Sequence, residues 1–252
     1  MAQILAVAEA EVRKLIHDPL ELITRAIQPV LWLGVFGQVM GKLRGIPAGN
    51  LSYEDFLAPG ILAQSVTFIA IFYGIAAIWE RDSGVLTKYL VSPAPRWTLV
   101  LGKAMGSGVR SLTQAVIVFV LAMLLGVHVR LEIASMAGLA AFCLLGAAIF
   151  STFSLIIACI VQTRERFMGI GQLLTMPLFF ASNAIYPLQL MPEWLRLIAR
   201  ANPLTYLVDA MRALMCVGAG SSYGLSTDFT ILALVLLVLT GVAARIYPAI
   251  LR

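Results

Sequence analysis

Six segments of this chain are long and apolar enough to cross a bilayer, and this feature constrains the fold more than any other. A hydrocarbon core of about 30 Å takes roughly 20 helical residues to cross. Strict alternation of apolar and polar residues is absent, so we expect helices rather than an outer-membrane barrel. The sequence therefore predicts an all-α polytopic membrane protein with six transmembrane helices. The expected spans are 27–45, 57–78, 105–127, 134–160, 168–187 and 229–247.

Composition excludes an ordinary soluble domain. The 252 residues are 60% hydrophobic and 12% charged, whereas soluble domains are about 45 to 50% apolar and about 25% charged. A net charge of +5 would suggest nucleic acid as a partner of a soluble protein. Here the basic residues follow a topology pattern and are expected to meet lipid headgroups. We expect membrane lipid and no nucleic acid as a partner.

Basic residues on short loops set the orientation of a membrane protein. With the N-terminus inside, the inner segments carry Arg13, Lys14, Arg25, Arg81, Lys88, Arg96, Lys103, Arg164, Arg166, Arg245 and Arg252. The outer segments carry Lys42, Arg44, Arg130, Arg196, Arg200 and Arg212. The excess inside predicts a multi-pass protein of the cytoplasmic (inner) cell membrane with both termini in the cytoplasm.

The first 26 residues are expected to form a leader ahead of the first span. Five apolar residues fall on one helical face, and Arg13, Lys14 and His17 fall on the other. This pattern predicts an N-terminal amphipathic interfacial helix on the inner surface. No cleaved secretory signal is expected, because the start lacks basic residues and the apolar run ends at Glu9. The apolar residues are Leu5, Ala8, Val12, Leu15 and Ile16.

One compact polar segment, 79–103, separates the second and third expected spans. It begins "WERDSG", in which Trp79 is typical of a membrane interface and the next residues supply acids and caps that start a helix. Gly84 allows a turn, and a short amphipathic helix of about two turns should follow. Its apolar stripe and the prolines that end it are Leu86, Tyr89 and Leu90, then Pro93 and Pro95. The alternative is an ordinary inside loop whose bases only fix topology.

This polar segment carries a family resemblance. The stretch "ERDSGVLTKYLVSPAPRWTLVLGK" resembles the cytoplasmic signature of type-2 ABC transporter permeases, the exporter class that includes drug, polysaccharide and lipid-linked glycan exporters. The matching positions are Glu80, Gly84, the Leu90–Pro93 stretch, Arg96 and Gly102–Lys103. A second stretch, "NPLTYLVDAMR" at 202–212, resembles the outer segment before the last span in that family. The resemblance covers nearly the whole chain, 1–252, as a single transmembrane domain.

The resemblance implies a function. In this family the loop after the second span resembles a coupling element that docks into a cleft on an ATP-hydrolysing subunit. The chain would then be the permease subunit of an ATP-driven exporter that moves an amphiphilic or lipid-like substrate outward by alternating access. The implied partners are two copies of a separate ABC ATPase subunit and a second permease copy or homologue. The coupling residues carried over are Glu80, Arg81, Asp82, Gly84, Leu86, Lys88, Tyr89, Leu90 and Pro93.

An ATP site is not expected in this chain. A P-loop needs G-x-x-x-x-G-K-[ST], because glycine amides cradle phosphate while Lys and a hydroxyl reach phosphate and magnesium. The nearest stretches, "GQVMGKL" and "VLGKAM", have the wrong spacing and lack Ser or Thr after Lys42 or Lys103. We therefore expect a transport subunit rather than an enzyme. No cofactor is expected here, and Mg-ATP would be bound by the partner.

The segment before the last span is too apolar for a free loop and too interrupted for a span. Pro187 should end the fifth span, Pro192 should start a new helix, and Asn202-Pro203 should break it. Residues 188–216 are thus predicted as a re-entrant helical hairpin on the outer side. The resemblance implies an outer gate here, formed by Arg196, Arg200, Asp209 and Arg212. The alternative is two interfacial helices that only stabilise the fold.

The resemblance also implies a substrate path between two permease copies, lined by the second and fifth spans. A mixture of aromatic, methionine and small polar side chains suits an amphiphile better than a bare ion. The alternative is that these residues only pack between helices. The candidates are Phe68, Phe72, Gln172, Met176, Phe179, Phe180 and Asn183.

An ion-coupled secondary transporter without an ATPase partner is the alternative function. Such a transporter should carry acidic residues near the bilayer centre, yet the six expected cores hold no Asp or Glu and only Asp209 is a candidate. A membrane enzyme or metal site would need clustered His, Cys or carboxylates, and the sequence predicts none. A channel would need a charged or carbonyl-rich filter, which is not evident. The cysteines, Cys143, Cys159 and Cys216, are expected to be small packing residues.

Overall fold

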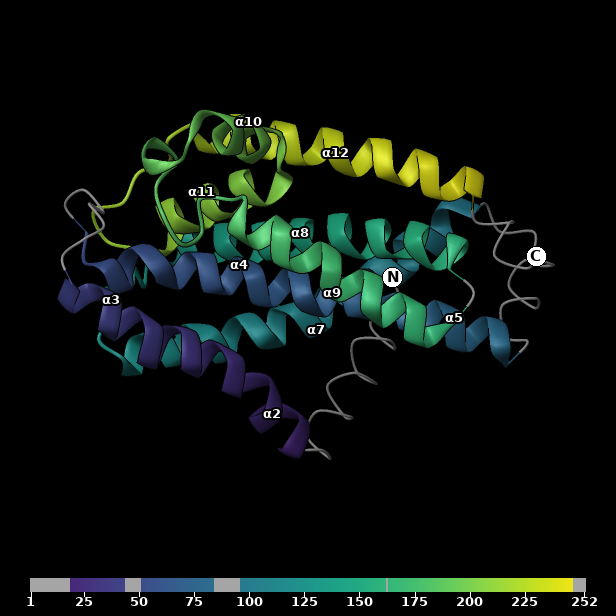
Figure 1. Cartoon of the computed structure of the whole chain (residues 1–252), viewed down its shortest axis with the longest axis horizontal. Helices are drawn as coiled ribbons and strands as arrows, with labels where there is room; N and C mark the ends of the chain where they lie inside the picture. The colour runs from purple at the N-terminus through teal and green to yellow at the C-terminus, as the bar shows by residue number, and fades with distance from the viewer. Residues whose placement is uncertain (1–18, 44–50, 84–95, 162, 247–252) are drawn as a thin grey trace.

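The computed structural model describes residues 19–43, 51–83, 96–161 and 163–246. These ranges are helical apart from turns and an isolated antiparallel bridge between Val129 and Cys216. The long helices run side by side along one axis (Figure 1). The elements are α2 (Pro19–Val30), η1 (Leu31–Gly37), α3 (Gln38–Leu43), α4 (Tyr53–Tyr73), α5 (Ile75–Asp82), α7 (Arg96–Leu124), α8 (Ile133–Ile160), α9 (Arg164–Phe180), η2 (Leu188–Leu190), α10 (Glu193–Ala201), α11 (Pro203–Met215) and α12 (Leu225–Ile246).

The two ends of the bundle differ in structure. The short helices α10 and α11 gather at one end together with α3 and the start of α4, while α5 and the start of α9 lie at the other (Figure 1). We refer to these as the α11 end and the α5 end. The expected leader lies outside the described residues as far as residue 18, as does the expected short helix over 84–95.

Four helices are long and apolar enough to cross a membrane within the described ranges. They are Tyr53–Tyr73, Gly106–Leu124, Ile133–Ile160 and Leu225–Ile246. The other two expected segments are shorter or interrupted: 27–45 is divided among α2, η1 and α3, and α9 has 17 residues. The described chain therefore forms a multi-pass membrane protein, and the six-span count stays a prediction.

The first expected span is interrupted by a π-helical stretch. Pro29 lies inside α2 and has no N–H to continue the hydrogen-bond ladder, and the wider η1 turn begins two residues later. Beyond it, α3 packs tightly on the start of α4. A Cβ at Gly41 would lie 2.5 Å from a carboxylate oxygen of Glu54, so a larger residue there would require the Glu54 side chain to move.

Local capping chemistry sets where several helices begin. Ser52 precedes α4 and accepts a hydrogen bond from the Asp55 N–H at 3.0 Å. Thr163 does the same for α9 by accepting from the Arg166 N–H at 3.4 Å. These side chains satisfy N–H groups that have no partner inside the helix. The second expected span consequently starts at Tyr53, four residues earlier than predicted, and it divides at Gly74 into α4 and α5.

The core is built around α4. Its apolar side chains are buried against α7, α8, α9 and α11, and the fully buried residues include Leu57, Ile61 and Leu62. Inside a bilayer such contacts stabilise by close packing, because lipid chains are as apolar as the side chains themselves. By contrast, α12 buries only 11% of its most apolar window. Its surface is therefore left for lipid or another chain.

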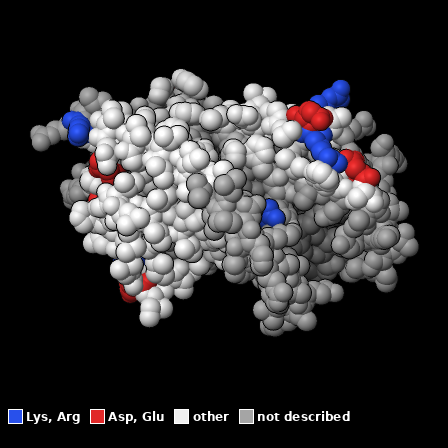
Figure 2. Space-filling model, turned by 90° about the horizontal axis from the view of Figure 1, so that it is seen from below, with Lys and Arg blue, Asp and Glu red and all other residues white. Residues whose placement is uncertain are grey.

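Exposed apolar side chains lie between charged ends. Leu234, Leu237 and Val238 on α12 are 62%, 72% and 59% exposed, and Val116 and Leu124 on α7 are 62% and 77% exposed. Figure 2 shows one face of the molecule, on which the coloured Lys, Arg, Asp and Glu side chains gather mostly toward the two ends. An apolar belt with charged rims is the surface expected of a protein that sits in a bilayer.

The end of α9 corrects one boundary. The sequence predicted that Pro187 would end this helix, but α9 ends at Phe180. The side-chain amide of Asn202 donates to the carbonyls of Leu178 and Ala181, each at 2.7 Å. The last carbonyls of α9 thus find a side-chain partner and the helix stops there. Two later predictions are confirmed: a helix, α10, begins after Pro192, and the chain breaks between α10 and α11 at Asn202-Pro203.

Candidate functional site

At the α5 end, the predicted coupling segment is joined to α9. Arg164, the first residue of α9, donates from Nη2 to Oδ2 of Asp82 at 3.0 Å. Its guanidinium carbon lies 3.6 Å from the centre of the Trp79 ring, in cation–π geometry. Asp82 and Trp79 both belong to α5, and both are exposed. This contact therefore ties the beginning of the 79–103 segment to α9.

Of the other predicted coupling residues, only Glu80 and Arg81 lie in a described helix. Glu80 and Arg81 belong to α5, although their side-chain contacts are outside what the structure describes. Gly84, Leu86, Lys88, Tyr89, Leu90 and Pro93 lie outside the described residues. Their coupling role stays a prediction.

The predicted path residues are divided among several surroundings. The rings of Phe68 and Phe72 are tilted against each other with centres 4.4 Å apart, and both line a pocket of about 320 Å³ between α2, α4 and α7. Phe179 is buried and packs edge-on against Trp32, with ring centres 5.4 Å apart. Asn183 is buried at the α11 end. The remaining three, Gln172, Met176 and Phe180, are exposed on the surface of α9.

Arg110 is a residue that the sequence analysis passed over. It lies in α7, inside the expected third span, and lines the same pocket as Phe68 and Phe72. Its guanidinium carbon is 5.6 Å from the centre of the Tyr73 ring. A basic residue inside an apolar window is costly to place in a membrane and is often functional. That signal was present in the sequence and could have identified this position.

The four predicted gate residues lie in different surroundings at the α11 end, although Arg196, Arg200 and Arg212 line one pocket. Arg196 donates to the backbone carbonyls of Leu188, Gln189 and Met191 and so holds the η2 turn. Arg200 is exposed. Asp209 and Arg212 are buried, with 1% and 6% of their surface exposed.

Arg212 is fixed beneath the surface by backbone carbonyls and an aromatic ring. It donates from Nη2 to the Asn183 carbonyl at 2.7 Å and from Nε and Nη2 to the Phe56 carbonyl at 3.3 and 3.2 Å. Its guanidinium carbon lies 3.9 Å from the centre of the Phe56 ring. Burial lowers the pKa of Arg212 to about 10, although nearby Asp209 acts in the opposite direction.

Asp209 belongs to a second buried group at the same end. One carboxylate oxygen of Asp209 accepts from the Ser221 hydroxyl at 2.8 Å and from the N–H groups of Ser222 and Tyr223 at 2.7 and 3.2 Å. The Ser221 oxygen also lies 2.9 Å from a carboxylate oxygen of Asp228. A hydroxyl has one proton, so it can donate to only one of these carboxylates at a time.

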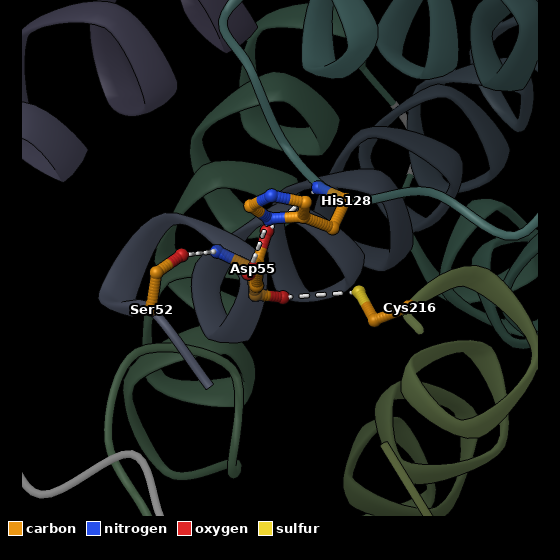
Figure 3. A network of polar contacts seen from close by, with 4 residues as sticks. All are labelled: Ser52, Asp55, His128 and Cys216. Carbon is orange, nitrogen blue, oxygen red and sulfur yellow. Dashed lines mark hydrogen bonds and ion pairs between the residues drawn. The ribbon is translucent and has the colours of Figure 1, made fainter. Parts of the chain in front are cut away.

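A third polar group at the α11 end was not predicted from the sequence (Figure 3). Asp55 accepts from the His128 N–H at 2.8 Å and lies 3.2 Å from the His128 ring nitrogen Nδ1. The Cys216 thiol donates to the Asp55 carbonyl at 3.1 Å. The Ser-x-x-Asp pattern at Ser52 could have indicated the helix start. Nothing local indicates His128, which is 73 residues away.

Asn202 is the residue of the second matching stretch whose role is clearest in the structure. Its Oδ1 accepts from the Leu204 N–H at 2.9 Å and caps α11. Its Nδ2 binds the two carbonyls at the end of α9. One side chain therefore satisfies the end of one helix and the start of another.

These features define a class of protein: a multi-pass helical membrane protein with polar groups concentrated at both ends of an apolar bundle. Within the described ranges, no three His, Cys, Asp or Glu side chains come together as metal ligands. The sequence profile of the family described as ABC-2 type transporter matches residues 2–216. The chain therefore belongs to the ABC-2 type transporter family, as its resemblance to type-2 permeases indicated.

Named relatives agree with this assignment. The chain is 31% identical over 202 residues to "Putative transport permease ycf38" of Cyanophora paradoxa, covering 78% of this chain and 68% of the relative. It is 24% identical over 236 residues to "Daunorubicin resistance ABC transporter permease protein DrrB1" of Streptomyces coeruleorubidus, covering 94% and 80%. It is 26% identical over 196 residues to "Nodulation protein J" of Rhizobium leguminosarum bv. trifolii, covering 77% and 73%. The chain is thus similar to ABC transporter permeases.

Proposed function

We propose that this chain is the transmembrane subunit of an ATP-driven exporter and that a separate ABC ATPase supplies the energy. The observation that carries this proposal is membership of the ABC-2 family in a chain whose sequence lacks a P-loop motif. Two copies of the ATPase, each binding Mg-ATP, would work beneath two copies of the permease or a permease and its homologue. The substrate would be an amphiphile, since relatives are named for daunorubicin resistance and probable multidrug transport.

The proposed topology has six spans and both termini in the cytoplasm, with the α5 end inside. The excess of basic residues on the segments assigned to that side supports this orientation. Labelling of a single cysteine placed at Lys88 tests it in intact cells. A membrane-impermeant maleimide should label this position only after the cells are opened. Labelling of this position in intact cells would show that the orientation is the opposite of the one proposed.

The 79–103 segment is proposed as the contact with the ATPase. The joint between Arg164, Asp82 and Trp79 supports this role, because it would pass a displacement of the segment directly to α9. Domain motion of this kind is a usual route for coupling in ATP-driven machines. The exposed residues of α9, among them Met176 and Phe180, would then line a path between two permease copies.

ATP hydrolysis tests the coupling directly. The chain is purified with a candidate ABC ATPase subunit, and hydrolysis is measured with and without the permease in lipid. We expect the permease to change the hydrolysis rate and Glu80→Ala to reduce that effect. The coupling role of this segment is wrong if adding the permease leaves the hydrolysis rate unchanged and the Glu80→Ala complex hydrolyses ATP at the wild-type rate.

Ion-coupled secondary transport is the second candidate function. The buried pair Asp209 and Asp228, which shares the Ser221 hydroxyl, favours it, because carboxylates of this kind carry protons in many transporters. Proteoliposomes containing the chain alone distinguish the two functions. Uptake driven by a proton gradient without the ATPase, and lost in Asp209→Asn, would support the second candidate over the first.

A further inference from the structure

A pocket at the α11 end has the size of a ligand site. Its volume is about 620 Å³, and ligand pockets commonly measure about 300 to 1,000 Å³. It lies between the start of α4, the turn after α9, the helices α10 and α11, and the loop before α12. Leu51, Phe56, Pro187, Leu188 and Leu190 give the pocket an apolar side.

Positive charge dominates the polar side of this pocket. Arg196, Arg200 and Arg212 line it, and the described lining contains no Asp or Glu. Asp209 is the carboxylate that acts electrostatically on Arg212, but it does not line the pocket and already accepts three hydrogen bonds from the 221–223 loop. A concave site with one sign of charge attracts ions of the opposite sign.

Two of the three arginines, Arg196 and Arg212, are held in position by hydrogen bonds. Arg196 is held by three carbonyls and Arg212 by two. No described hydrogen bond or ion pair uses Nη1 of Arg212, and burial of this charge is unfavourable in the absence of a carboxylate partner. Ser222 and Tyr223 add polar groups, and burial raises the pKa of Tyr223, which keeps its hydroxyl protonated as a donor.

We propose that this pocket binds the anionic head of an amphiphile, an oxyanion such as a phosphate or carboxylate attached to an apolar chain. The guanidinium groups provide charge-assisted hydrogen bonds to the oxyanion, and the wall formed by residues such as Phe56 and Leu190 contacts the chain. The site goes beyond the proposed export function. It rests on that function only for its position on the outer side, and its binding does not require the ATPase.

Arg200 is the residue of choice for the test. Its side chain is exposed and makes no described hydrogen bond, so Arg200→Gln and Arg200→Glu should leave the fold intact. The full chain is purified in dodecyl maltoside and titrated with dodecyl phosphate, and bound molecules are counted by native mass spectrometry. We expect Arg200→Gln to weaken binding about tenfold, the effect of one lost charge-assisted hydrogen bond, and Arg200→Glu to weaken it further. Lys42→Gln, which removes an exposed cation outside the pocket, should bind like the wild type.

Competition identifies the source of the oxyanion. If inorganic phosphate displaces dodecyl phosphate at similar concentration, the site takes the free ion. If phosphatidylglycerol displaces it and inorganic phosphate does not, the site takes a lipid-like anion. Either result supports the site. Wild-type affinity in a folded Arg200→Glu variant, or equal competition by zwitterionic dodecyl phosphocholine, would overturn it. Loss of ATPase coupling in a protein that still binds dodecyl phosphate would count against the proposed function alone.

Discussion

Arg164 and Asp82 are 82 residues apart in sequence and form a hydrogen-bonded ion pair of 3.0 Å at the α5 end. Both side chains are partly exposed, at 34% and 40%, so their contribution to folding is small. The pair nevertheless fixes the last turn of α5 against the first turn of α9. We therefore expect loss of this pair to affect coupling to the ATPase more than the free energy of unfolding.

Arg164→Ala should reduce coupling with little loss of stability. An exposed ion pair contributes about 1 kcal/mol or less to folding, so the thermal midpoint in detergent should barely change. Stimulation of the partner ATPase should fall about fivefold, the effect of losing roughly 1 kcal/mol of coupling free energy. Arg166→Ala removes a neighbouring exposed cation of α9 and serves as the control. Equal effects of both variants would show that only net charge matters.

Asn202→Asp should destabilise the α11 end strongly. The carboxylate can still cap α11, but it loses the donors that bind the Leu178 and Ala181 carbonyls and places negative charge beside them. Leaving two partly buried carbonyls without donors costs about 2 to 4 kcal/mol. Asn202→Ser keeps a cap and should cost less. Thermal unfolding in detergent compares the two, and equal midpoints would contradict the double role of this amide.

Gly60→Ala should destabilise by overpacking. A Cβ at Gly60 would lie 2.5 Å from the Ala184 carbonyl oxygen and 2.9 Å from the Ala184 Cα, so backbone must move, at a cost of about 1 to 3 kcal/mol. Gly241→Ala in α12 meets nothing within 4 Å and should be neutral or gain up to about 1 kcal/mol from helix propensity. We expect the thermal midpoint to fall in Gly60→Ala and to stay the same or rise in Gly241→Ala.

Asp228→Asn should stabilise the α11 end, whereas Ser221→Ala should destabilise it. Ser221 has one proton for two carboxylates, and the amide would supply a donor where a carboxylate supplies only charge. Removing the hydroxyl instead leaves the Asp228 oxygen without its donor, while Asp209 keeps the N–H groups of Ser222 and Tyr223, at a cost of about 1 to 3 kcal/mol. Thermal unfolding at pH 8 measures both. A destabilised Asp228→Asn variant would show that the second negative charge is needed.

Cys216 should react with maleimide only at high pH in the folded protein. Burial, followed by the nearby Asp55 charge, raises the pKa of Cys216 to about 12, and the thiolate is the reactive form. Because this pKa lies above the ordinary value of 9.0, the thiol favours folding below about pH 9. That contribution is lost as the pH rises toward 12. Labelling of a variant that keeps only Cys216 measures the rate against pH.

A matched pair of variants tests the cause of the Cys216 shift. Asp55→Asn removes the charge that raises the pKa of Cys216 and should move the labelling profile to lower pH. His128→Asn breaks the same polar group but keeps the Asp55 charge, so its profile should stay near that of the wild type. Identical profiles in both variants would mean that loosening of the loop, and not charge, controls access to the thiol.

Local patterns predicted much of the helical framework. The expected span 134–160 corresponds to α8 at Ile133–Ile160, and 229–247 corresponds to α12 at Leu225–Ile246. The division of 188–216 into two short helices followed from proline chemistry at Pro192 and Pro203. Apolar length and proline geometry act within a few residues, so one sequence is enough to recognise them.

Partners that are distant in sequence could not be predicted in this way. The end of α9 depends on an amide that lies 21 and 24 residues further along the chain. The pairing of Asp55 with His128 and the carbonyl cradle of Arg212 depend on how helices meet. The predicted gate residues form a group of charges in the sequence, but their division into a turn clamp, an exposed cation, a buried cation and a buried acid follows from packing alone.

Both ends of α9 are bonded to distant parts of the chain: Arg164 at its start donates to Asp82 of α5, and Asn202 donates to the carbonyls at its end. Its 17 residues make a strut about 25 Å long at 1.5 Å per residue. Because both ends of α9 are bonded to other helices, a shift of α9 would act on α5 and on α11. Under the proposed coupling, a displacement of α5 would therefore act on one end of α9 and reach Asn202, the cap of α11, at the other.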